Sequence, residues 1–242
     1  MLEPLIEAAL DFDAEAVSVR AGFRAPSHAV AGGILAAEFF VNNHGPAPFY
    51  LALAMDRTRL RPEYISFSAR LETTAIVFSD PLSQVEVSGG PATTIVIQPG
   101  DSFSQPLIVN EFLDLEQARR SLVNGEKQAL FLACQRQLPL AQVATQAFQF
   151  DQHAPLVEVT LVLNIERDDT ALELTIQQLA DKLHSDWVAA PVSAEREQAA
   201  MRLIALRTPL ILPLLRELSQ HPDPAVRRHV QRGLAFSSTW QT

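Results

Sequence analysis

The spacing of apolar residues changes once along this 242-residue chain, near Asp169. Before that point apolar side chains recur at every second position, and a strand places alternate side chains on opposite faces. The clearest alternating run is Val157, Val159, Leu161, Leu163 and Ile165. After it, apolar residues recur at every third or fourth position, as on one face of a helix. That second pattern begins with Leu172, Ile176, Leu179 and Leu183. The change of period predicts strands first and helices afterwards.

Short strands separated by Gly, Pro and Asn turns are typical of an antiparallel β-sandwich. We expect strands near 15–23, 34–41, 49–54, 64–67, 75–78, 93–97, 128–135 and 157–165. Residues 1–10 are expected to form a short helix or a loose lead-in, and 107–123 to contain a helix that stops at Asn124-Gly125. The first 168 residues hold one cysteine, Cys134, and no tryptophan, so they lack the Cys–Trp–Cys core of true immunoglobulin domains. By pattern, this part resembles the broader Ig-like class of bacterial sandwiches.

The helical part contains an internal repeat. Arg196-x-x-Ala199-x-x-x-Leu203 matches the later Arg227-x-x-Val230-x-x-x-Leu234. Between them, Asp223 is suited to cap a helix and Pro224 to occupy its first position. The stretch from 210 to 235, with its Asp-Pro-x-Val-Arg motif, resembles a HEAT-like helical hairpin of the short bacterial kind. We therefore predict a mixed chain, all-β then all-α, with an antiparallel Ig-like β-sandwich domain at 1–168 and a small HEAT-like α-helical domain at 169–242.

The net charge, the lengths of the apolar runs and the sequence at Met1 limit the classes of partner and the compartment that we expect. The net charge is −9, which disfavours phosphate backbones, so we expect no nucleic acid. No apolar run approaches the ~20 residues of a membrane helix, so we expect no membrane span. The start at Met1 lacks the basic and apolar regions of a secretory signal, which as written predicts the cytoplasm. If a signal sequence was trimmed, the compartment is the periplasm or another extracytoplasmic space.

Three arginines at alternate positions, Arg57, Arg59 and Arg61, form one candidate binding site. In an extended chain they point the same way, and a positive stripe of this kind grips carboxylate, sulfate or phosphate. The alternative interpretation is an edge strand guarded by charge that ends at Pro62.

A second candidate is the basic face of the last helix, carried by Arg227, Arg228 and Arg232. Helical repeats of this kind bind partners, and arginines supply charge-assisted contacts. The alternative interpretation is a solvated face or a ladder between the repeats.

No strong catalytic motif is present in the sequence. Nucleophile elbow, phosphate-binding loop, dinucleotide and zinc-protease motifs are all missing, and the six histidines lack the i, i+4 spacing of a helical metal site. Cys134 lies in an alternating apolar run, which predicts a buried, inert thiol. We expect no catalytic residue, no cofactor and no metal. The sequence favours a non-catalytic protein–protein interaction or scaffold protein, with another protein as partner; the alternative is an anion- or saccharide-binding β-sandwich protein, with Tyr50, Tyr64 or Phe49 as stacking surfaces.

Overall fold

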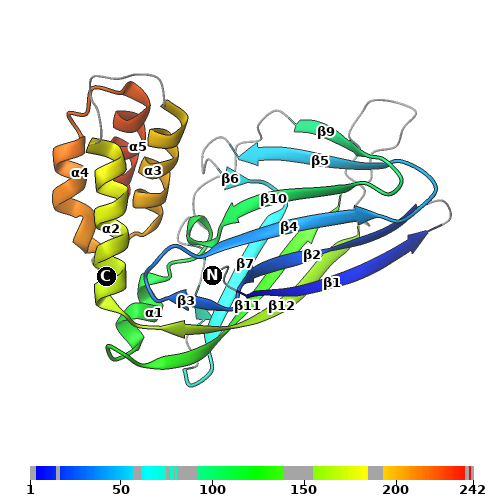
Figure 1. Ribbon diagram of the computed structural model, residues 1–242, viewed down its shortest axis with the longest axis horizontal. Coiled ribbons are helices and arrows are strands. Elements are labelled where there is room, and N and C mark those ends of the chain that lie inside the picture. Colours follow the sequence, from blue (N-terminus) through cyan, green and yellow to red (C-terminus); the bar gives the residue numbers. More distant parts are fainter. Residues whose placement is uncertain are drawn as a thin grey trace. The chain divides into compact units, whose positions relative to one another are not determined.

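The computed structural model describes residues 4–14, 17–56, 61–74, 77–78, 80, 92–138, 155–184, 193–237 and 240. The chain is mixed α and β, with strands in antiparallel and mixed sheets and with most of the helices after them. Figure 1 shows the elements and labels most of them. The strands are β1 (Leu5–Ala14), β2 (Val17–Pro26), β3 (His28–Val30), β4 (Ala36–Asn43), β5 (Phe49–Asp56), β6 (Arg61–Pro62), β7 (Ile65–Leu71), β8 (Val77–Phe78), β9 (Ala92–Ile97), β10 (Ser102–Ile108), β11 (Lys127–Gln137) and β12 (Leu156–Glu166).

The helices lie mainly in the last third of the chain. They are α1 (Glu116–Ser121), α2 (Asp169–His184), α3 (Ser193–Ala205), α4 (Leu212–Leu218) and α5 (Pro224–Phe236), with 3-10 turns at Val109–Glu111 and Pro209–Ile211. Helix α2 begins where the apolar period changes, as predicted. Within the described ranges, every helix falls short of the length and apolarity that a bilayer crossing needs.

The strands form a β-sandwich with an aromatic core. One sheet has the order β1-β2-β4-β10, a second β3-β12-β11-β7-β8, and a smaller third β6-β5-β9. Phe23 on β2 and Phe67 on β7 meet edge to face with ring centroids 5.8 Å apart, which joins the inner faces of the first two sheets. Phe39 and Phe112 extend this cluster at 5.3 Å and 5.0 Å. Edge-to-face aromatic contacts of this kind add to the stability gained from burial alone.

The prediction of a helix or loose lead-in at residues 1–10 is wrong. Leu5–Ala14 forms β1, which pairs with β2 along its whole length. The pairing is close at Gly22, where a β-carbon would lie 2.2 Å from the carbonyl oxygen of Ala8. Because Gly22 has no side chain, β1 can approach β2 this closely. The uneven apolar pattern of residues 1–10 is explained by the position of β1 at the edge of its sheet.

The chain divides into two compact units. The first comprises residues 1–28, 36–113 and 129–164; the second comprises 29–35, 114–128 and 165–242. The second unit thus combines the helices with two short segments from the strand-rich part of the sequence. The division into domains 1–168 and 169–242 stays a prediction.

The helical unit has one apolar core. Helix α3 lies between α2 and α5, and α5 packs on α4. Leu172, Leu179 and Leu183 of α2 are buried there as their spacing predicts, together with Trp240 near the end of the chain. Val30 and Ile34 pack against the same core, so the segment 29–35 is a structural part of the helical unit.

Candidate functional site

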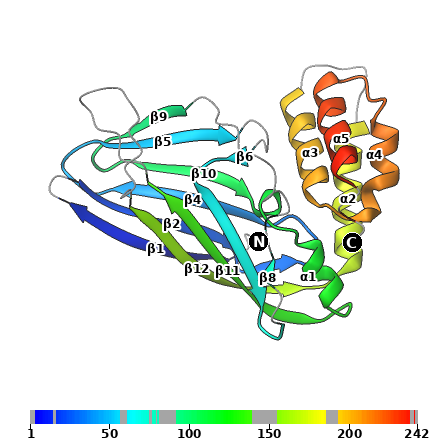
Figure 2. The same ribbon diagram turned by 180° about the vertical axis from the view of Figure 1, so that it is seen from behind.

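A pocket opens on the outer face of the sheet that contains β7, β8, β11 and β12. It has a volume of about 210 Å³ and is lined by Ser68, Ala69, Arg70, Val77, Phe131, Ala133 and Thr160. Figure 2 shows β7, β11 and β12 side by side in this sheet. The strand register places Ser68 beside Ala133 and Arg70 beside Phe131. The short side chains of Ser68 and Ala133 therefore lie next to the large side chains of Arg70 and Phe131. This difference in size leaves a hollow on the face of the sheet.

One side of the pocket is formed by an arginine stacked on an aromatic ring. The guanidinium carbon of Arg70 lies 4.3 Å from the ring centroid of Phe131. Val77 on β8 pairs with Arg70 from the other side. In the part of the chain that the structure describes, no carboxylate lies within ion-pair distance of Arg70. A guanidinium stacked in this way keeps its N–H groups at the edge of the plane, where a planar acceptor can approach.

Polar side chains form a hydrogen-bonded row two residues farther along the same strands. The hydroxyl of Ser66 donates to Oε1 of Gln135 at 3.0 Å, and Nε2 of Gln135 donates to Oε1 of Glu158 at 3.0 Å. Residues two apart on a strand are about 6.6–6.8 Å apart on the same face. The pocket is thus bordered by an apolar row with one cation and by a polar row, a combination that suits an amphipathic ligand.

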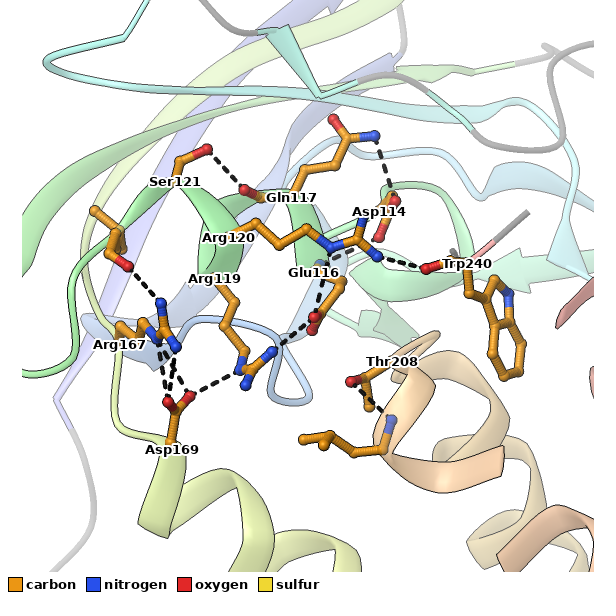
Figure 3. A network of polar contacts seen from close by, with 12 residues as sticks. Asp114, Glu116, Gln117, Arg119, Arg120, Ser121, Arg167, Asp169, Thr208 and Trp240 are labelled. Carbon is orange, nitrogen blue, oxygen red and sulfur yellow. Dashed lines mark hydrogen bonds and ion pairs between the residues drawn. The ribbon is translucent and has the colours of Figure 1, made fainter. Parts of the chain in front are cut away.

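A separate network of charged groups lies inside the helical unit (Figure 3). Arg119 on α1 donates to Oδ1 of Asp169 at 2.8 Å and to Oε1 of Glu116 at 2.7 Å. Asp169 also accepts from Arg167, and Arg120 donates to the carbonyl of Trp240. The network joins α1 to the start of α2 and to the end of the chain. Its members bond to one another, which marks it as a structural element.

Glu116 is the most buried acid of this network. Its side chain is 2% exposed, and Oε2 has no hydrogen-bond partner in the described structure. Burial raises the pKa of Glu116 above its ordinary value of 4.5, although Arg119 and Arg120 act to lower it. A β-carbon on Gly32, which has a φ of +76°, would lie 3.0 Å from Oε2. The close approach of the 29–35 segment therefore helps to dehydrate this carboxyl.

We expect Glu116→Gln to gain stability relative to the wild type as the pH rises. The pKa of Glu116 in the folded protein exceeds its ordinary value of 4.5, so the folded protein loses stability as the pH rises from 4.5 to the folded pKa, and the loss is constant above it. Glutamine removes this loss. Urea unfolding of both proteins at pH 4.5 and pH 7 measures the change. The exposed substitution Glu173→Gln on α2 is the control, and an equal pH response of both variants contradicts the expectation.

The arginine stripe predicted at Arg57, Arg59 and Arg61 is described only in part. Arg57 and Arg59 lie outside the described residues. Arg61 is buried, forms a two-pronged ion pair with Asp80 and donates to the carbonyl of Glu111 at 2.9 Å. Its guanidinium therefore already holds a carboxylate of the chain itself. The role of the stripe in binding an anion stays a prediction.

The aromatic residues considered for saccharide stacking differ in exposure. Phe49 is buried in the core, whereas Tyr50 and Tyr64 are half-buried. Burial, together with Glu63, raises the pKa of Tyr64 to about 12. Sequence reasoning instead missed Phe131, whose ring lies beside the pocket on the outer face. Alternation places Phe131 on that face, but nothing local indicates that Arg70 stacks on it.

The three arginines predicted as a partner surface have different surroundings on α5. Arg227 donates to the carbonyl of His221 at 2.6 Å and to that of Pro222 at 2.7 Å, which closes the turn before the helix. Arg228 is exposed, and the guanidinium of Arg232 lies 5.9 Å from the ring centroid of Phe236. Arg227 thus has a structural role, and partner binding by this face stays a prediction.

The remaining candidates for chemistry are metal-ligating side chains, the one cysteine and a buried arginine. Among them, no group of three or more His, Cys, Asp or Glu side chains is placed to hold a metal ion. Cys134 is buried, as predicted, and burial raises the pKa of its thiol. Arg136 is buried between the sheets, where it donates to Gln105 and to the carbonyl of Ala52, and burial lowers its pKa to about 10.

Comparison with known proteins adds no assignment. No family model matches the sequence, and no curated protein matches it. Structures of a β-glucosidase from Listeria innocua align with 65% of this chain and 17% of that chain. The complex with glucose has 8% identity and a TM-score of 0.30, and the complex with isofagomine has 7% and 0.28. A likeness at this level supports neither a shared fold nor a shared function.

Proposed function

We propose that this chain is a non-catalytic binding protein that holds another protein against the outer face of β7, β8, β11 and β12. The observation that carries the proposal is the pocket of about 210 Å³ between Phe131 and Thr160. Sites for whole small molecules usually measure about 300–1,000 Å³. The smaller, open pocket suits one anchoring side chain of a larger partner, as at the centre of a protein interface.

Exposed apolar side chains on the same strands extend the contact beyond the pocket. Val77 on β8 is 61% exposed and Val162 on β12 is 51% exposed. On β12, exposed residues alternate with buried ones, so Val162 faces outward together with Thr160. A stable interface covers about 800 Å² on each partner, so side chains around the pocket must take part. An anchor pocket bordered by exposed apolar residues supports binding of a protein surface.

The finer fold assignments belong to the same proposal. We infer that the sandwich is of the Ig-like class and that the helical hairpin is HEAT-like. Two observations support the second assignment: Asp223 accepts from the backbone of Ala225 at 2.8 Å at the start of α5, and Val226 and Val230 are buried in the helical core. In this interpretation the helices are a scaffold, and the sheet face provides the contact.

We expect a photo-crosslinking amino acid at position 160 to capture one defined protein in cells of the source organism. Thr160 lines the pocket on an exposed strand position, so a bound partner lies within reach of it. Mass spectrometry identifies the product. Phe131→Glu, which places a charge in the pocket wall, should reduce the yield at least tenfold, because an anchoring contact contributes about 2 kcal/mol or more.

Thr94 provides a matched control for the crosslinking experiment. It is an exposed threonine on β9, in a different sheet, and should not capture the same protein. Thermal unfolding confirms that Phe131→Glu is folded, since Phe131 is only half-buried. Identical products from positions 94 and 160, or an unchanged yield in the variant, would overturn the proposal.

A further inference from the structure

We infer that the pocket recognises an acidic side chain, Asp or Glu, in an otherwise apolar extended segment of the partner, and that Arg70 is the receptor for its carboxylate. The inference rests on the proposed function and names the chemistry of the anchoring group. It differs from the arginine stripe at 57–61, because Arg70 lies on β7 and lines a pocket of its own.

The charge environment of Arg70 is the first argument. The chain has a net charge of −9, and many of its described arginines have acidic partners nearby. The paired arginines are Arg20, Arg24, Arg61, Arg119, Arg120 and Arg167. Among the described residues, Arg70 has an aromatic ring beside it and no carboxylate within ion-pair distance. The guanidinium at the wall of the pocket attracts an external anion locally, and this local attraction acts against the net charge of −9, which repels anions at longer range.

The geometry of the stacked pair favours a carboxylate. The guanidinium carbon lies over the ring of Phe131, and this contact restricts the side chain of Arg70, so fewer side-chain rotations are lost when Arg70 binds. The edge of the guanidinium offers parallel N–H donors, which match the two oxygens of a carboxylate. The hydroxyls of Ser68 and Thr160 line the same pocket and add donors for the carboxylate oxygens.

The surroundings of the pocket indicate that the acid is part of a longer segment. Val77 and Val162 offer apolar contacts on the exposed face, whereas a free carboxylate would use only Arg70 and the hydroxyls. On the polar side, the carboxylate of Glu158 is held by Gln135 and repels a second acid. One acidic side chain with apolar neighbours fits this pattern better than a run of acids.

Fluorescence anisotropy with two labelled pentapeptides tests the inference. The probes are Val-Thr-Glu-Thr-Val and its counterpart Val-Thr-Gln-Thr-Val, which differ in one charge. In an extended chain, both Val side chains lie on the same face as the central residue, so the face that meets the pocket is apolar around the acid. The wild type should bind the Glu peptide at least tenfold more tightly, and added salt should reduce this preference. Arg70→Met should abolish the preference, and Arg70→Lys should retain part of it because lysine keeps the charge without the planar donors.

Arg20→Met is the matched control, because Arg20 is a half-exposed arginine on β2 in the other sheet. This variant should keep the full preference for the Glu peptide. Equal affinity for both peptides, or an unchanged preference in Arg70→Met, would overturn the inference. So would binding of free glutarate as tight as that of the Glu peptide, since the ligand would then be a small carboxylate.

The crosslinking experiment separates this inference from the proposed function. If position 160 captures a partner while neither peptide binds, the acidic anchor is wrong and the protein-binding function stands. If position 160 captures nothing specific, the proposed function is overturned as well.

Discussion

Arg119→Met should destabilise the protein by about 3 kcal/mol, because it leaves a buried carboxylate without its nearest cation. Arg119 holds Glu116, whose side chain is 2% exposed, and also Asp169 at the start of α2. Removing one partner of a buried pair costs more than the pair itself contributes, since the remaining charge stays dehydrated. Urea unfolding followed by tryptophan fluorescence measures the loss, and the buried Trp240 reports on the same unit.

Two further variants make this expectation specific. Arg120→Met should cost about 1 kcal/mol or less, because Arg120 is 37% exposed and lies 3.7 Å from Glu116. The double variant Arg119→Met with Glu116→Leu should recover most of the loss, because apolar replacement of both members of a buried pair is often neutral. A double variant less stable than Arg119→Met alone would show that the buried charge is not the cause.

Gly22→Ala should cost about 3 kcal/mol and release the first strand from its sheet. A β-carbon at this position would lie 2.2 Å from the carbonyl oxygen of Ala8 and 2.6 Å from the Cα of Ala9. Both are backbone atoms of β1, so no side-chain rotation relieves the contact. Backbone hydrogen exchange across Leu5–Ala14 should become faster, in addition to the fall in the free energy of unfolding.

Gly125→Ala separates the effect of close contact from that of backbone conformation. Gly125 has a φ of +83°, and a β-carbon there would meet no described atom within 4 Å. Its substitution should therefore cost about 1–2 kcal/mol through strain alone. Hydrogen exchange in β1 should then be unchanged. If Gly22→Ala lowers the free energy of unfolding no more than Gly125→Ala does, the close approach of β1 is not the reason why position 22 requires glycine.

Local periodicity predicted the secondary structure well where one face of an element is buried. The alternation from Val157 to Ile165 is confirmed in β12, where those residues are buried and their neighbours are exposed. The apolar spacing of α2 is likewise confirmed by its place in the helical core. By contrast, β1 lies at the end of its sheet, and Leu5 and Leu10 are exposed on it. Its apolar pattern was therefore weak, and the prediction for residues 1–10 was wrong.

The pocket could not be predicted from the sequence, because residues from four strands, β7, β8, β11 and β12, line it. Ser68, Ala133 and Thr160 belong to β7, β11 and β12. Alternation places each of them on an outward face, but only the pairing register brings them together. The same holds for Arg70 and Phe131, which lie 61 positions apart in sequence and directly opposite in the sheet. Sequence reasoning instead favoured arginines that are neighbours along the chain, such as Arg57, Arg59 and Arg61.

The composite make-up of the helical unit has a consequence for synthesis on the ribosome. Its first segment, 29–35, is translated long before its last helix, and Val30 and Ile34 must wait for α2 and the later helices before they are covered. Arg119 likewise emerges before Asp169. The nascent chain therefore exposes these apolar and charged groups until α2 and the later helices have been made, and slow elongation between residues 35 and 236 should increase its demand for chaperones.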